Sequence, residues 1–339
     1  MNIVVRGANW IGDAVMTIPA LRRLRRIYPD AVISLHTRPW AEGVFRDADF
    51  IDEIVPIAGR GSVRNVIDQS RNLRERHFDL AILFPNSFES ALVARLARIP
   101  KRVGYSTEKR GFLLTDSLVV PAWKNESHES EYYLHLVDSL SAEGGSDERS
   151  ELQVSSERRS EARNRLVHEG VQPGRKVVGI GAGSTNSFAK RWPTKSFSQL
   201  ADLLAIEQDA DVVFLGNENE ADVSNAIIAG SREKHVDLTG RTDLAMATAI
   251  LSELDLFVSN DMGLAHISAA VGTPTVVIFG PTNEKTTRPL GSQVEIIREP
   301  VECSPCMLRE CPIDHRCMTR ISPERVFETA CKMLETQVR

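Results

Sequence analysis

The sequence contains no apolar run close to the ~20 residues that a helix needs to span a bilayer. Its first residues, MNIVVRGANW, lack the basic segment and long apolar stretch of a secretory signal and instead predict a first strand. Positive charge is not in excess, since 46 Asp and Glu outnumber 41 Lys and Arg, whereas nucleic-acid-binding domains are usually strongly basic. These absences predict a cytoplasmic protein without a nucleic-acid partner, in which any membrane contact is peripheral.

Two common phosphate-binding signatures are also missing. The loop after the first expected strand has two glycines but not the GxGxxG spacing of a dinucleotide-binding fingerprint, which counts against a nicotinamide-dependent dehydrogenase. GxxxxGK[ST], the signature of P-loop nucleotide hydrolases, does not occur either.

Short β-branched runs alternate with longer amphipathic stretches, which predicts βαβ units around mainly parallel sheets. Strands are expected at residues 3–7, 32–37, 52–57, 79–86, 101–106, 176–183, 210–217, 234–240, 255–260 and 273–280. Helices are expected at residues 14–29, 62–77, 89–100, 156–170, 197–208, 220–231, 243–254, 263–272 and 322–338. For the last helix, Ser322 is the expected N-cap and Pro323 the first helical residue.

A chain of 339 residues is too long for one core of usual size, so two domains are expected. The fold class predicted is α/β, with two Rossmann-like, doubly wound domains at residues 1–160 and 161–321, and with the Ser-, Glu- and Gly-rich run 141–151 as a linker. Residues 322–339 are expected to form a C-terminal helix that packs back on the first domain. Ligands of such sheets bind at the carboxyl ends of the strands, so the cleft between the domains is the expected site.

The loop at residues 6–15 places a carboxylate at the start of a helix. Asp13 can cap that helix and interact with its positive end. It can equally act as a general base that takes a proton from an attacking hydroxyl. The residues alone leave both interpretations open.

Three further loops follow strands of the second half. In the loop at residues 179–193, Gly181, Gly183, Ser184 and Thr185 offer donors to an anion and Lys190 can neutralise phosphate charge, although one such loop alone is more often only polar surface. Glu218 or Glu220 can accept hydrogen bonds from a ribose diol, or simply start a solvated helix.

In residues 258–282, Asp261 and Gly263 begin a helix whose N-terminus favours phosphate, His266 follows in the next turn, and Thr282 is a candidate sugar or phosphate contact. Asp261 can also be only a cap, and a lone helical histidine such as His266 is more often structural.

At these residues the chain resembles the ADP-heptose:lipopolysaccharide heptosyltransferases of glycosyltransferase family nine. The resemblance covers nearly the whole chain, and its carriers are residues 7–25, the K-x-W-P element at 190–193 and, most specifically, residues 259–282. The NWIGD loop, with Trp10, resembles the corresponding loop of the family members that add the second heptose.

The resemblance implies a GT-B fold and an inverting transfer of heptose from ADP-L-glycero-D-manno-heptose to the first heptose of the lipopolysaccharide inner core. The first domain would bind the acceptor and the second the nucleotide sugar. Asp13 matches the catalytic base of the family and Lys190 its diphosphate-binding lysine. Further expected substrate contacts are Gly12, Gly183, Ser184, Thr185, Glu218, Asp261, Met262, Gly263, Leu264 and His266. Met262 stands where many members have Ser or Thr, so a hydroxyl contact to phosphate is expected to be missing.

The mechanism implied is a single displacement in which Asp13 deprotonates the acceptor and Lys190, helix N-termini and loop amides stabilise the departing diphosphate. No DxD element stands in a convincing cleft position, so the resemblance implies no required cofactor and no catalytic metal. Rival hypotheses remain: a first heptosyltransferase or another family member with a different acceptor, an epimerase of the same fold, and a non-catalytic nucleotide-sugar binding protein. Fold alone does not separate them.

One cysteine cluster and two basic groups admit more than one interpretation. Cys303, Cys306, Cys311 and Cys317 crowd into fifteen residues together with His315, which admits a structural zinc site or a loop of reduced thiols. Two basic groups are either solvated faces or attract phosphorylated sugar and anionic lipid. The first consists of Arg22, Arg23, Arg25 and Arg26, and the second of Lys101, Arg102, Lys109 and Arg110.

Overall fold

The computed structural model describes residues 1–57, 59, 61–141 and 149–336. The chain forms two compact units, Met1–Ser150 and Glu151–Arg339. The boundary lies ten residues before the predicted one at 160/161, because α7 (Ser156–His168) packs on α10 (Leu244–Leu251) and so belongs to the second unit. Within the predicted linker at 141–151, residues 142–148 lie outside the described part of the chain.

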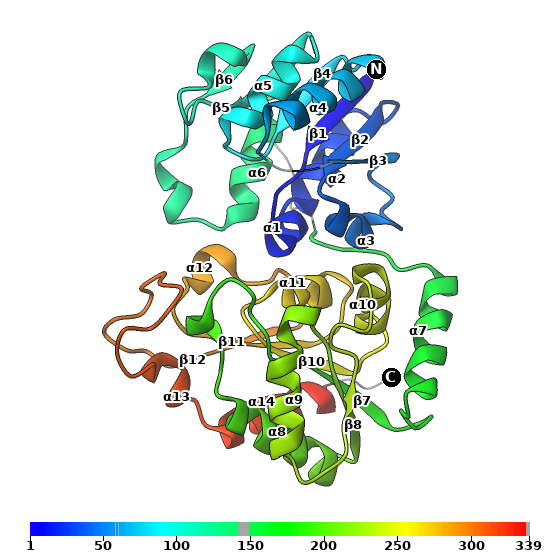
Figure 1. Cartoon of the computed structure of the whole chain (residues 1–339), viewed down its shortest axis with the longest axis vertical. Coiled ribbons are helices and arrows are strands. Elements are labelled where there is room, and N and C mark those ends of the chain that lie inside the picture. Colours follow the sequence, from blue (N-terminus) through cyan, green and yellow to red (C-terminus); the bar gives the residue numbers. More distant parts are fainter. Residues whose placement is uncertain (58, 60, 142–148, 337–339) are drawn as a thin grey trace. The chain divides into compact units, whose positions relative to one another are not determined.

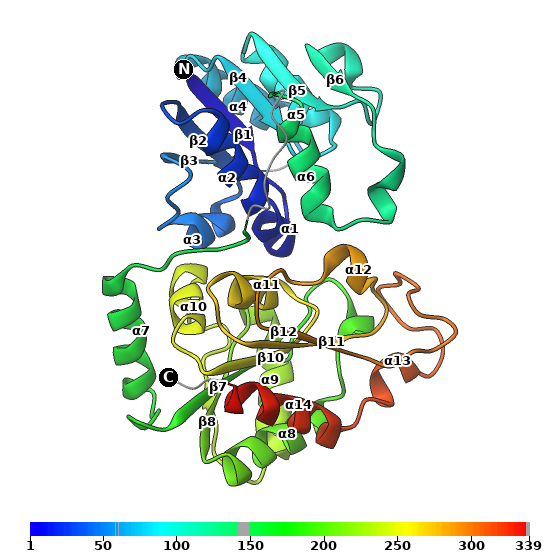
Figure 2. The same ribbon diagram turned by 180° about the vertical axis from the view of Figure 1, so that it is seen from behind.

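The first unit is a six-stranded parallel sheet with the order β3-β2-β1-β4-β5-β6. Its strands are β1 (Asn2–Arg6), β2 (Val32–Thr37), β3 (Glu53–Pro56), β4 (Leu80–Leu83), β5 (Lys101–Tyr105) and β6 (Asp116–Leu118). Its helices are α1 (Ile11–Met16), α2 (Ile18–Ile27), α3 (Glu42–Phe45), α4 (Val63–Glu75), α5 (Phe88–Leu96) and α6 (Glu129–Asp138), with short 3-10 turns η1 (Pro39–Ala41), η2 (Gly111–Leu113) and η3 (Ala122–Asn125). Helix α2 packs against α6 and α4 against α5, and the two pairs cover opposite faces of the sheet (Figures 1 and 2).

The second unit is also a six-stranded parallel sheet, with the order β12-β11-β10-β7-β8-β9. Its strands are β7 (Lys176–Gly181), β8 (Ala210–Phe214), β9 (Val236–Asp237), β10 (Leu256–Asn260), β11 (Thr275–Phe279) and β12 (Val294–Arg298). Besides α7 and α10, its helices are α8 (Thr194–Glu207), α9 (Ala221–Gly230), α11 (Gly263–Ala270), α12 (Glu284–Thr287), α13 (Arg316–Thr319) and α14 (Pro323–Glu335), with 3-10 turns η4 (Phe188–Lys190) and η5 (Glu218–Glu220).

Both sheets have the same topology, because the strands of each unit, counted along the chain, follow the order 3-2-1-4-5-6. The predicted pair of doubly wound parallel sheets is therefore confirmed. In this topology the strand order reverses between β1 and β4 in the first unit and between β7 and β10 in the second. Ligands of such sheets bind beyond the carboxyl ends of the strands at this switch point.

The central strands follow directly from their composition. All residues of β4, β10 and β11 are buried, as expected for strands of a parallel sheet that is covered on both faces. The missed strands, β6 and β12, are edge strands in which most residues are partly or fully exposed, so they lack the continuous apolar run that indicates a buried strand. The single helix predicted at 14–29 is broken at Thr17, because Pro19 in the first turn of α2 has no N–H to continue α1.

Helix α14 differs from its prediction in where it packs. Its N-terminus is as expected: Pro323 is the first helical residue and the Ser322 hydroxyl accepts a hydrogen bond from the Arg325 N–H, 3.3 Å between N and O. The apolar face of α14, which includes Val326 and Ala330, packs on α8, β10 and β11 within the second unit. Helix α14 (Pro323–Glu335) therefore belongs to the second unit rather than packing back on the first. Among the helices described, none is both long and apolar enough to cross a bilayer.

Candidate functional site

Three predicted site residues meet beyond the carboxyl end of the second sheet. The Lys190 Nζ lies 2.6 Å from Asp261 Oδ2, and the Thr282 hydroxyl donates to the same oxygen at 2.7 Å. Lys190 ends η4, Asp261 follows β10 and Thr282 follows β11. The Asp261 carboxylate is buried, whereas a quarter of the Lys190 side chain remains exposed. The aspartate thus holds the ammonium group of a lysine that is not fully buried, which leaves this side chain within reach of an anion.

A buried amide joins this lysine segment to the loop after β7. Asn260, the last residue of β10, is fully buried, and its amide N donates to the carbonyls of Ala182 at 2.7 Å and Gly183 at 3.3 Å. Its side-chain oxygen accepts from the Trp192 N–H at 3.0 Å. Asn260 therefore ties together two loops across the β7–β10 switch point. Sequence reasoning missed it, although an asparagine at the end of a buried, mostly apolar strand is a usable signal.

The loop after β7 has little room for side chains. A Cβ added at Gly183 would lie 2.1 Å from the Glu220 carboxyl carbon, so a side chain there would have to displace this carboxyl group. The Ser184 carbonyl accepts from Arg191, 3.2 Å from Nε and 3.1 Å from a terminal nitrogen. Thr185 is exposed at the end of the loop. Gly183, Ser184 and Thr185 thus form a fixed loop at the predicted anion site.

The acid that faces this loop is Glu220 rather than Glu218. Glu220 is buried, and its carboxylate accepts from the Thr185 hydroxyl at 3.2 Å and from the Asn217 N–H at 3.0 Å. Burial raises the pKa of Glu220 above its ordinary value. Glu218 is exposed on η5, beside Gly240. A ribose contact at Glu218 stays a prediction, while Glu220 supports the loop.

The start of α11 brings together the remaining predicted residues of the second unit. Met262 is the N-cap of α11 and makes no side-chain capping bond. Because methionine has no hydroxyl, this position offers no hydroxyl contact to phosphate. The Met262 sulfur closely covers Gly181, since a Cβ added to that glycine would lie 2.9 Å from it. Gly263 is partly exposed, whereas Leu264 and His266 are buried, and substrate contacts of these residues stay predictions.

Asp13 lies in the first turn of the short helix α1, but it is not the N-cap. Trp10 occupies the cap position without a side-chain bond, and Gly12 and Asp13 are both partly exposed at the carboxyl end of β1. Tyr133 of α6 lies nearby: burial, followed by the Asp13 charge, raises the pKa of Tyr133 well above its ordinary value. Asp13 is therefore partly exposed rather than buried, and its role as a general base stays a prediction.

The two basic groups are mixed in exposure, because Arg26, Lys101 and Lys109 are exposed while several of the others form internal ion pairs or are buried. The Arg22 guanidinium lies 3.2 Å from Asp49, that of Arg23 lies 3.0 Å from Asp138, and Arg25 pairs with Asp52. In the second group, Arg102 and Arg110 are buried.

Arg110 organises the loop after β4 at the carboxyl edge of the first sheet. Its guanidinium donates to the Tyr105 carbonyl at 2.9 Å and to the Ser87 carbonyl and the Ser90 hydroxyl at 3.0 Å each. Burial lowers the pKa of Arg110 to about 10. Sequence reasoning gave no hint of this role, because a buried arginine and a surface arginine look alike without the tertiary structure.

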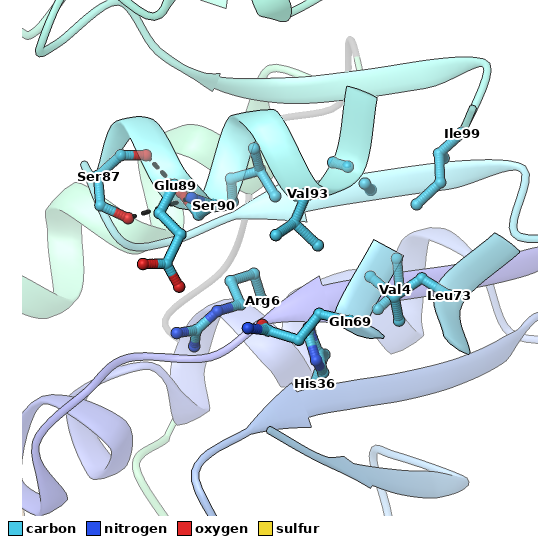
Figure 3. A pocket seen from close by; sticks show the side chains of 13 residues that line it. Val4, Arg6, His36, Gln69, Leu73, Ser87, Glu89, Ser90, Val93 and Ile99 are labelled. Atoms are coloured by element: carbon cyan, nitrogen blue, oxygen red, sulfur yellow. Dashed lines mark hydrogen bonds between the residues drawn. The ribbon is translucent and has the colours of Figure 1, made fainter. Parts of the chain in front are cut away.

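A small pocket lies inside the first unit, between α4, α5 and the sheet. Figure 3 shows that the Arg6, Gln69 and His36 side chains lie close together in it and that the Glu89 carboxylate points toward Arg6. The pocket leaves about 20 Å³ for water-sized molecules, which is room for about one water. It is too small for a sugar nucleotide, so we do not place the substrate there.

His36 gives the first unit an expected pH-dependent stability. Burial, then the charges of Arg6, Arg38 and Arg76, lower the pKa of His36 to about 3. The folded chain therefore holds this ring neutral, while the unfolded chain protonates it below pH ~6.5, so stability is lost as pH falls from there toward 3. At pH 5 the loss from this group is on the order of 2 kcal/mol. We expect the unfolding free energy to fall less between pH 7 and pH 5 in His36→Gln than in wild type.

Denaturant unfolding at the two pH values measures this difference. His168→Gln is the matched control, because its side chain is 82% exposed, and it should keep the wild-type pH dependence. An unchanged dependence in His36→Gln would contradict the assignment of the effect to His36.

The cysteines are free thiols of graded exposure. Cys303 and Cys306 are exposed, Cys311 is partly buried and Cys317 is buried. Burial, then the neighbouring Cys303, Cys311 and Cys306, raise the pKa of Cys317. Within the ranges that the structure covers, no group of three or more His, Cys, Asp or Glu side chains is placed to hold a metal ion. A structural zinc stays a prediction, which metal analysis of the purified protein would test.

Comparison with known proteins agrees with this arrangement. The profile of glycosyltransferase family 9 (heptosyltransferase) matches residues 66–316. Lipopolysaccharide heptosyltransferase 2 of Escherichia coli K12 is 30% identical over 312 residues, with 88% of each chain covered, and lipooligosaccharide heptosyltransferase 2 of Campylobacter jejuni is 26% identical over 99% of each chain.

Solved structures give the same result. The E. coli ADP-heptose lps heptosyltransferase II is similar over the full length of both chains, with a TM-score of 0.86 and 28% identity. A family 9 glycosyl transferase of Veillonella parvula has a TM-score of 0.89 at 21% identity, covering 99% of this chain and 98% of its own, and supports the fold alone. The predicted α/β fold of the GT-B type is thus confirmed, and the chain belongs to glycosyltransferase family 9, the heptosyltransferases.

Proposed function

We propose that this chain is an inverting heptosyltransferase that moves heptose from ADP-L-glycero-D-manno-heptose to the first heptose of the lipopolysaccharide inner core. The relatives that match over 88% to 99% of the chain are named heptosyltransferase 2, which supports this acceptor. The observation that carries the proposal is the Lys190–Asp261–Thr282 cluster at the carboxyl edge of the second sheet, where a diphosphate would bind.

In this proposal the second unit binds the donor. The Lys190 ammonium and the amides of Gly183, Ser184, Thr185 and Gly263 face the diphosphate. Negative charge grows on that group as the bond to the anomeric carbon breaks. Asp261 holds the lysine in place, so little reorganisation is needed at the moment of reaction.

The first unit binds the acceptor and supplies the base. Asp13, with Gly12 beside it, takes the proton of the acceptor hydroxyl. The hydroxyl oxygen then attacks the anomeric carbon opposite the departing ADP, and the configuration at that carbon inverts. The bond formed is the new glycosidic bond, the bond broken joins heptose to the diphosphate, and the proton stays on Asp13.

Release of ADP from ADP-heptose tests the proposal directly. We expect rapid release with an acceptor that carries one heptose on lipid A–Kdo, and little release without acceptor. Release only with an acceptor that lacks heptose would assign the chain to the first transfer instead. Absence of release with either acceptor, in a protein that still binds ADP, would identify a non-catalytic nucleotide-sugar binding protein.

The proposal also implies where in the cell the enzyme works. The acceptor is attached to a lipid, so we propose that the enzyme works in the cytoplasm and touches the inner membrane peripherally. Flotation with vesicles of anionic lipid, with and without acceptor, would separate binding to the acceptor from binding to the bilayer.

A further inference from the structure

The cysteine-rich segment, residues 303–317, lies directly against the residues around Lys190. The Ala189 N–H donates to the Arg309 carbonyl at 2.9 Å. The Ser187 hydroxyl lies 3.4 Å from the Leu308 carbonyl and 3.3 Å from that of Arg309. The segment therefore holds the backbone of η4, the turn that ends with the lysine.

The same segment holds the turn after β11. The N–H groups of Cys306 and Met307 donate to the Pro281 carbonyl at 3.0 and 2.8 Å, and the Ser304 hydroxyl donates to the Gly280 carbonyl at 2.6 Å. Pro281 directly precedes Thr282, the hydroxyl partner of Asp261. One segment thus supports both sides of the Lys190–Asp261–Thr282 cluster.

His315 makes the side-chain contact in this arrangement. Its Nε2 lies 2.6 Å from the carbonyl oxygen of Ala189, the residue before Lys190. A carbonyl oxygen only accepts, so Nε2 carries the hydrogen and donates it. His315 sits in the left-handed region, φ 57°, and its ring reaches η4 from the start of α13.

These contacts matter because η4 has little structure of its own. It is a single 3-10 turn, with local bonds from Lys190 N–H to the Ser187 carbonyl at 3.2 Å and from Arg191 N–H to the Phe188 carbonyl at 3.0 Å. Most of the cysteine-rich segment is exposed, so it contributes few side chains to the core. Its polar contacts instead define where η4 lies, and a misplaced catalytic group loses much of its effect.

We propose that the cysteine-rich segment is the positioning element of the donor site and that His315 is a positioning residue for Lys190. The inference rests on the proposed role of Lys190 at the diphosphate. It assigns His315 no contact with the substrate.

The test compares His315→Ala with His315→Gln. Both replace histidine at the same left-handed position, so both carry a similar backbone cost, but glutamine keeps an N–H donor near the place of Nε2. By calorimetry we expect ADP to bind about 5-fold more weakly to His315→Ala, the usual effect of one hydrogen bond, and within about 2-fold of wild type to His315→Gln. The KM for the donor should rise in parallel, and His168→Ala should bind ADP as wild type does.

A double variant separates positioning from general stability. If His315 acts through Lys190, adding His315→Ala to Lys190→Met should weaken ADP binding no further. Wild-type ADP affinity in His315→Ala, equal weakening in His315→Ala and His315→Gln, or an undiminished effect in the Lys190→Met background would each overturn the inference. Absence of ADP binding by the wild-type protein would instead refute the proposed function, and the inference with it.

Discussion

Asp13→Asn is expected to lower kcat by about 10²- to 10⁴-fold, the usual contribution of a general base. Asparagine has the shape of aspartate, and the loss of one carboxylate charge in the first turn costs about 0.3–1 kcal/mol, so α1 should still form. If Asp13 served only to start the helix, the substitution would leave turnover almost intact. The variant thus separates the two interpretations that the sequence leaves open, and initial rates of ADP release at saturating acceptor measure the difference.

Glu42→Gln is the matched control for this variant. Glu42 is likewise an acid in the first turn of a short helix of the same unit, α3. Its loss should change neither kcat nor the melting temperature by much. Comparable activity of Asp13→Asn and Glu42→Gln would remove Asp13 from the mechanism.

Lys190→Met is expected to reduce kcat/KM by about 10²- to 10³-fold, the typical loss when one preorganised group stops stabilising transition-state charge. Methionine keeps the apolar stem but removes the ammonium. It also leaves the buried Asp261 carboxylate with the Thr282 hydrogen bond but without its cation. We therefore expect a lower melting temperature as well.

The expected loss of melting temperature can be reversed without restoring kcat/KM. In the double variant Lys190→Met, Asp261→Asn the buried charge is gone, so the melting temperature should recover while turnover does not. Lys195→Met is the control, because Lys195 is exposed on the neighbouring helix α8. If turnover returned together with stability, Lys190 would be a structural residue and the diphosphate would need another partner.

The sequence was most informative about site residues whose position in the fold is determined by the end of a strand. Lys190, Asp261 and Thr282 were each predicted from loops after apolar strands, and parallel strands deliver such loops to one edge of the sheet. Their direct contact at 2.6 and 2.7 Å follows from that edge once the strand order is known. The strand order itself came from the structure.

What the sequence did not reveal depends on tertiary packing. Glu218 and Glu220 stand two positions apart on one short turn, and which of them turns inward depends on the space left by Gly183. Asn260 and Arg110 act through bonds to backbone carbonyls of segments far away in the chain. No local periodicity records such bonds, so these supports were visible only in the folded chain.

The shared strand order has a consequence for folding kinetics. At the two switch points Ile3 pairs with Leu80 and Val178 with Leu256, so 77 and 78 positions separate the partners, whereas other neighbouring strands in the described ranges pair across at most 34. Closing the longest loops costs the most chain entropy and slows folding. The loops that carry Asp13, Lys190 and Asp261 follow the strands that form these most remote pairings. A nucleotide bound beside the β7–β10 seam should accordingly slow unfolding of the whole second unit rather than only the fraying of its edges.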